Sequence, residues 1–93
     1  MIAVIATVRA KPGKGAEVEA DFRAWAEAVR ANEPGTLQYT LSRSREDPQL
    51  YYTFELFADQ AAVDAHMRNF QARPAGPDLF TEPPKILVLD KIV

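Results

Sequence analysis

Cysteine is absent from this sequence of 93 residues. Its absence excludes disulfide bonds, thiolate catalysis and zinc sites that use cysteine ligands. Histidine and tryptophan occur once each, as His66 and Trp25. Because one histidine with scattered carboxylates makes a poor ligand set, we expect no bound metal.

The chain also lacks a block of one charge and a long apolar run. Its 11 Lys and Arg residues are interspersed with 13 Asp and Glu residues, for a formal net charge of −2. We therefore expect no nucleic-acid partner, which needs a clustered basic face, and no binding to an anionic membrane. The apolar run at residues 2–8 is too short to span a bilayer, and no signal peptide is visible, so we expect a cytoplasmic protein. Neither of the common glycine-rich phosphate-binding motifs occurs.

Hydrophobic residues make up 47% of the chain and charged residues 26%, as in ordinary globular proteins. A chain of this length predicts one domain, covering residues 1–93. Its core is small, so the protein would gain stability from dimerisation.

The hydrophobic periodicity predicts four strands and two helices. The strands are expected at residues 2–10, 36–45, 50–57 and 85–93, and the first helix at residues 16–32, before the break at Pro34. The second helix starts after Asp59, a good N-cap, and is broken by residues 73–77. One further helical turn is expected at residues 78–81.

This order of elements, β-α-β-β-α-β, predicts a ferredoxin-like α+β fold. Its four-stranded antiparallel sheet carries both helices on one face. The predicted strands at residues 2–10, 50–57 and 85–93 offer apolar side chains to both faces of the sheet. The uncovered face therefore needs a partner, and the simplest is a second copy of the chain in a two-fold homodimer.

Two residues are candidates for acid–base chemistry. His66 lies on the apolar face of the second helix, and an imidazole exchanges protons near neutral pH. Glu55 lies in the middle of a strand, and the short turn after that strand brings the helix back over its end. A Glu55–His66 pair is one interpretation. The alternatives are a packed histidine bonded to a backbone carbonyl, and a salt bridge from Glu55 to Arg43 or to the partner protomer.

Several short stretches resemble a known family: the P-G-K turn at 12–14, E-P-G at 33–35, E-D-P at 46–48 and E-L-F-A-D-Q-A-A-V-D-A-H at 55–66. They are similar to the antibiotic biosynthesis monooxygenases, which include quinol monooxygenases and belong to the dimeric α+β barrel group. His66 and Glu55 match the family's histidine and acidic residue. Phe57 stands where many members carry tryptophan, and Asn69 where members commonly carry a second histidine.

The resemblance implies a homodimer with a pocket in each protomer, between the sheet and the helices. It also implies an oxidoreductase that oxygenates a quinol-like or polyketide-like aromatic without metal or flavin. The catalytic residues would be His66 and Glu55, and the substrate would contact Trp25, Tyr39, Phe57, Met67 and Phe70. Two alternatives remain open: a non-redox isomerase or lyase acting on a small carbonyl metabolite, and a non-catalytic dimer that binds a small ligand or is merely structural.

Overall fold

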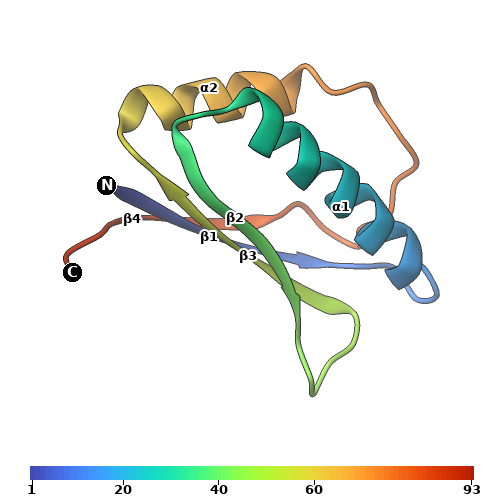
Figure 1. Ribbon diagram of the computed structural model, residues 1–93. Coiled ribbons are helices and arrows are strands. Elements are labelled where there is room, and N and C mark those ends of the chain that lie inside the picture. Colours follow the sequence, from blue (N-terminus) through green and yellow to red (C-terminus); the bar gives the residue numbers. More distant parts are fainter.

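The computed structural model describes residues 1–93. It contains one four-stranded sheet. Both helices lie on the same face of that sheet (Figure 1). The elements follow in the predicted order, which confirms the ferredoxin-like α+β fold. Their bounds are β1 (Ile2–Arg9), α1 (Gly15–Asn32), β2 (Thr36–Arg43), β3 (Leu50–Phe57), α2 (Gln60–Gln71) and β4 (Lys85–Asp90).

The strand order in the sheet is β2-β3-β1-β4, and all neighbouring strands are antiparallel. The register pairs Glu55 of β3 with Val4 of β1 on one side and with Tyr39 of β2 on the other. Paired residues share a face of the sheet, and all three are buried beneath the helices. This row therefore places a carboxylate under the helical layer near the centre of the sheet.

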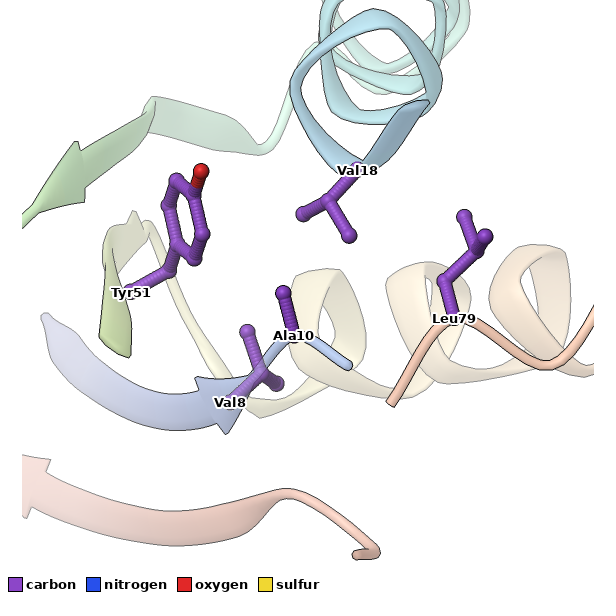
Figure 2. Packing of buried hydrophobic residues seen from close by; sticks show 5 residues of the cluster. All are labelled: Val8, Ala10, Val18, Tyr51 and Leu79. Carbon is purple, nitrogen blue, oxygen red and sulfur yellow. The ribbon is translucent and has the colours of Figure 1, made fainter. Parts of the chain in front are cut away.

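A cluster of buried apolar residues fills the space between α1 and the sheet (Figure 2). Val18 comes from α1, Tyr51 from β3, and Leu79 from the segment after α2, and they meet Val8 and Ala10. The predicted helical turn at residues 78–81 is wrong. The backbone there instead pairs with the end of β1 and the residues after it. The amide of Thr81 donates to the Arg9 carbonyl at 3.0 Å, and the amide of Lys11 donates to the Leu79 carbonyl at 2.8 Å.

Three strands are shorter than predicted: β1 ends at Arg9 instead of residue 10, and β2 ends at Arg43 instead of residue 45. The last strand ends at Asp90 and does not continue to residue 93. In β2, the alternation of Leu37, Tyr39 and Leu41 would place all three on one face of a regular strand. A register irregularity between Thr36 and Gln38 displaces Leu37, which is exposed, while Tyr39 is buried.

The face of the sheet opposite the helices carries exposed apolar side chains. The register forms rows across it, one of which joins Phe54, Ile5 and Leu87. Phe54 is 40% exposed and Leu87 is 59% exposed, and Leu89 in the next row is also exposed. The protomer thus leaves apolar surface uncovered where the sequence predicted a partner.

Candidate functional site

His66 lies on α2 with its side chain turned toward the sheet. The helix is fixed at its start by Asp59, whose carboxylate accepts a hydrogen bond from the amide of Ala62 at 2.9 Å. The buried residues of α2 are Val63 and His66, three positions apart and so on one face. The imidazole is only 3% exposed. It is therefore shielded from solvent in the protomer, and both ring nitrogens must find protein partners.

The first partner is Glu33, in the turn between α1 and β2. Its Oε1 lies 2.7 Å from Nδ1 of His66. Oε1 also accepts a hydrogen bond from the Thr36 hydroxyl at 2.8 Å, and Oε2 accepts one from Asn69 at 3.1 Å. Burial alone would raise the pKa of Glu33, but the hydrogen bonds from Asn69, His66 and Thr36 hold that pKa below its ordinary value.

The second partner is Glu55 on β3. Oε1 of Glu55 lies 3.4 Å from Nε2 of His66, yet Oε1 has no hydrogen bond of good geometry. Its Oε2 accepts a hydrogen bond from the Thr53 hydroxyl at 2.7 Å, since Thr53 and Glu55 point to the same side of the strand. Burial raises the pKa of Glu55, although the Thr53 bond and the nearby His66 act in the opposite direction.

Three aromatic rings surround the imidazole. The ring centroids of Phe57, Tyr39 and Trp25 lie 5.2, 5.5 and 5.7 Å from that of His66, and all three residues are buried. Burial raises the pKa of Tyr39 far above its usual value. The indole Nε1 of Trp25 is buried without a hydrogen-bond partner. The imidazole is thus held between two carboxylates inside an apolar, aromatic enclosure.

The other two predicted substrate contacts lie farther out. Met67 packs on the apolar cluster formed by Val4, Phe57 and Val63. Phe70 is 46% exposed, and its ring lies edge-on to Trp25 at 5.9 Å. The Arg73 guanidinium covers Trp25 at 4.8 Å and pairs with Asp21 at 2.8 Å. Phe70 and Arg73 therefore cover the outer side of Trp25.

Two grooves flank α1, and His66 lines neither. The first, of about 450 Å³, lies between α1 and β2, with Phe22, Ala26, Tyr39, Leu41 and Tyr51 among its walls. The second, of about 470 Å³, lies between α1 and the segment after α2. Tyr39 belongs to the first groove and to the aromatic enclosure. Aromatic rings therefore enclose His66, and the first groove meets that enclosure at Tyr39.

Glu33 is the site residue that the sequence did not reveal. The sequence showed it only as the residue that Pro34 forces out of the helix. The expected alternative partner of Glu55, Arg43, lies elsewhere: its guanidinium pairs with Glu19 at 2.8 Å, and Glu19 also accepts a hydrogen bond from Tyr51. One signal could have suggested the role of Glu33, because a residue before proline is held in an extended conformation that can turn its side chain inward.

The wider structure adds two observations on partners and ligands. No group of three or more His, Cys, Asp or Glu side chains is placed to hold a metal ion. Neither α1 nor α2 has the length and apolar character that crossing a membrane requires.

Comparison with known proteins adds sequence and structural relatives. Residues 1–75 match the family described as antibiotic biosynthesis monooxygenase. A Caulobacter crescentus structure, described as a candidate antibiotic biosynthesis monooxygenase, is 33% identical with a TM-score of 0.83, over 98% of this chain and 89% of that one. A Pseudomonas aeruginosa protein is 32% identical with a TM-score of 0.78, over 99% and 94%. No curated protein matches the chain.

Proposed function

Because this chain belongs to the antibiotic biosynthesis monooxygenase family, we propose that it is a cofactor-independent monooxygenase. Its substrate would be a quinol-like or polyketide-like aromatic with an acidic C–H or O–H group. The observation that carries the proposal is the imidazole of His66, held between two carboxylates and enclosed by aromatic rings. Such a group can exchange a proton in surroundings from which water is excluded.

In the proposed reaction, the pair formed by Nε2 of His66 and Oε1 of Glu55 removes a proton from an activated CH₂ of the substrate. The resulting carbanion gives one electron to dioxygen, and the two radicals combine to form a C–O bond. Loss of water from the peroxide leaves a new carbonyl, so one oxygen atom enters the product and the other leaves as water. The substrate supplies all the electrons, and dioxygen is the oxidant.

The aromatic residues would bind the substrate. Tyr39 lines both the groove beside α1 and the enclosure of His66, so a planar ring in the groove would approach the imidazole by displacing the Tyr39 side chain. Trp25 and Phe57 would pack on the bound ring. Met67 and Phe70 would form the outer wall.

A homodimer forms part of the same proposal. The sheet face opposite the helices exposes Phe54, Leu87 and Leu89, and the register aligns them in neighbouring rows. Packing this face on that of a second copy would bury the rows and leave the helices on the outside. The His66 enclosure lies on the other face of the sheet, so the groove beside α1 that meets it at Tyr39 would stay outside this interface.

Oxygen uptake with anthrone and a panel of quinols tests the proposed activity. The wild type should consume one dioxygen per product carbonyl, and ¹⁸O₂ should label that carbonyl. The variant His66→Ala should lose activity by a factor on the order of 100. Gln71→Ala, an exposed change on the same helix, should retain full activity. Equal rates for the wild type and His66→Ala would rule out the proposed base for these substrates. Turnover without oxygen would favour the isomerase or lyase alternative.

The closed enclosure of His66 favours a second candidate, a non-catalytic dimer that binds a small ligand or is merely structural. In that case the two carboxylates and the imidazole would serve only the packing of α2 on the sheet. His66→Ala would then lower the free energy of unfolding, and neither protein would consume oxygen with any compound of the panel.

A further inference from the structure

The Glu33 carboxylate contacts the side of the His66 ring that faces away from Glu55. We propose that Glu33 is a positioning residue for His66: it holds a proton on Nδ1, so that Nε2 and Glu55 Oε1 share the one proton that the site can exchange. The catalytic consequence rests on the proposed function. The placement of the two protons does not, because it follows from contacts within the protein.

All of the groups around Glu33 donate to it. The Thr36 hydroxyl and the Asn69 amide donate to its two oxygens, which leaves His66 Nδ1 as the third partner, at 2.7 Å from Oε1. An ionised carboxylate accepts all three bonds, and a distance of 2.7 Å is typical of a charge-assisted hydrogen bond. Nδ1 therefore carries a hydrogen and points it at Glu33.

The opposite ring nitrogen has one partner. Nε2 lies 3.4 Å from Glu55 Oε1, and that buried oxygen has no hydrogen bond in the present geometry. One proton placed between them satisfies both atoms, whether it is bound to nitrogen or to oxygen. The two placements are tautomers, and each gives the group Glu33–His66–Glu55 a net charge of −1. Without this proton the buried group would carry −2, at a high cost in free energy.

Few other charged groups face the ring. Tyr39 of β2 faces it as a neutral phenol, since burial raises the pKa of Tyr39. Arg73 lies behind Trp25, over the indole ring. The charge on His66 is thus set mainly by Glu33 on one side and Glu55 on the other.

The turn at Glu33-Pro34-Gly35 fixes the position of the Glu33 carboxylate. Pro34 keeps Glu33 out of helical geometry, at φ −125° and ψ 81°. Gly35 lies against Ala62 of α2, and its carbonyl accepts a hydrogen bond from the amide of Ala58 at 2.9 Å. Ala62 precedes His66 by four residues and so lies on the same side of the helix. The backbone therefore docks the turn on α2 beside His66.

Nitrogen-15 NMR of the wild-type protein tests the proposal directly, because one histidine gives one pair of ring nitrogen signals. In a pH titration without substrate, Nδ1 should show the shift of a protonated nitrogen at every pH at which the protein is folded. Only Nε2 should change. A neutral ring with its hydrogen on Nε2 would overturn the proposal, whatever the enzyme does with quinols.

The variant Glu33→Gln gives a second test. Glutamine keeps the shape of the side chain, removes its charge and can donate to Nδ1, so a signal from the Nε2–H tautomer should appear. Glu19→Gln is the matched control, since Glu19 also accepts bonds from a hydroxyl and a cationic side chain but contacts Tyr51 and Arg43. It should leave both ring signals unchanged. An unchanged spectrum in folded Glu33→Gln would contradict the proposal; if that variant fails to fold, the wild-type titration decides.

Discussion

Gly35 and Ala62 lie so close together that a β-carbon at position 35 would fall 2.6 Å from the β-carbon of Ala62. A real pair of such atoms does not approach so closely, so the turn between α1 and β2 needs a glycine to dock on α2. The backbone of Gly35 has no positive φ, which means that space and not backbone conformation requires the glycine. The Gly35–Ala62 contact also places Glu33 beside His66, because Glu33 and Gly35 belong to one turn and Ala62 and His66 belong to α2.

We therefore predict that Gly35→Ala destabilises the protein by roughly 1–3 kcal/mol, the usual cost of overpacking a buried contact. The turn must move away from α2, and the Glu33–His66 distance should lengthen with it. Urea unfolding followed by circular dichroism measures the loss in free energy, and the Nδ1 signal of His66 reports the displaced carboxylate.

Two further variants test whether the destabilisation comes from the clash between the β-carbons at positions 35 and 62 or from replacing a glycine with alanine in general. Ala62→Gly removes the opposing β-carbon, so Gly35→Ala combined with Ala62→Gly should be destabilised by less than the sum of the two single changes. Gly76→Ala is the matched control, since a β-carbon at position 76 meets nothing within 4 Å. Additive losses in the double variant would show that the contact with Ala62 is not the cause.

The sequence was sufficient to predict the fold because each element had a clear period. Val18, Trp25 and Val29 repeat at helical spacing and are the buried residues of α1. Alternation along β3 predicted that Glu55 and Phe57 share a face, and both are buried. The short turn after β3 was enough to suggest that Glu55 approaches His66, and the two side chains do lie in contact.

Sequence periodicity could not reveal Glu33 or the closed enclosure. Glu33 lies outside any regular element, and its partner is 33 positions away in the chain. Its inward direction depends on the docking of Gly35 on Ala62, which is a tertiary contact. The family resemblance implied that Phe70 contacts the substrate. Phe70 is exposed because α2 reaches the edge of the enclosure there, and Trp25 covers the ring from inside.

The pKa shift of Glu55 predicts a stability that depends on pH. Burial raises the pKa of Glu55 in the folded protein above its ordinary value of 4.5. Its contribution to stability is therefore complete below pH 4.5 and is lost as the pH rises through the folded pKa. Glu55→Gln should abolish this loss and make the protein more stable than the wild type at the upper end of that range. Urea unfolding at a series of pH values measures the difference.

Glu33 should behave in the opposite way. Its pKa is lowered in the folded protein, so its contribution is present above the ordinary value and is lost as the pH falls through the folded pKa. Glu33→Gln should therefore lower the free energy of unfolding most at neutral pH and least in acid. Glu27→Gln, which removes an exposed carboxylate from α1, serves as the control and should follow the wild-type profile. If the free energy of unfolding depended on pH in the same way in the wild type and in the Glu55→Gln, Glu33→Gln and Glu27→Gln variants, both pKa directions would be contradicted.

The proposed dimer predicts the effect of a charge on the open face of the sheet. Phe54 is 40% exposed in the protomer and pairs with Ile5, which in turn pairs with Leu87 on its other side. Phe54→Asp would bury an unpaired carboxylate in the interface. A cost of about 3 kcal/mol weakens the dimer more than about 100-fold. Sedimentation velocity over a range of concentrations measures the change in Kd.

A matched charge on the other side of the molecule controls for net charge. Ala24 is an exposed residue of α1, which lies on the opposite face of the sheet from Phe54. Ala24→Asp should leave the sedimentation of the dimer unchanged. A wild type that sediments as a monomer at every concentration would contradict the proposed dimer, and equal weakening by the two variants would contradict the proposed interface.

Trp25 should report the protonation of the site by its fluorescence. It is the only tryptophan, and its ring centroid lies 5.7 Å from that of His66. A protonated imidazole quenches indole emission more strongly than a neutral one, so the emission should rise as the shared proton is lost with increasing pH. In His66→Gln this pH dependence should disappear. Arg73→Ala uncovers the outer side of the indole and should shift the emission to longer wavelength while leaving the pH dependence in place. A pH dependence that persists in His66→Gln would show that another group near Trp25 titrates.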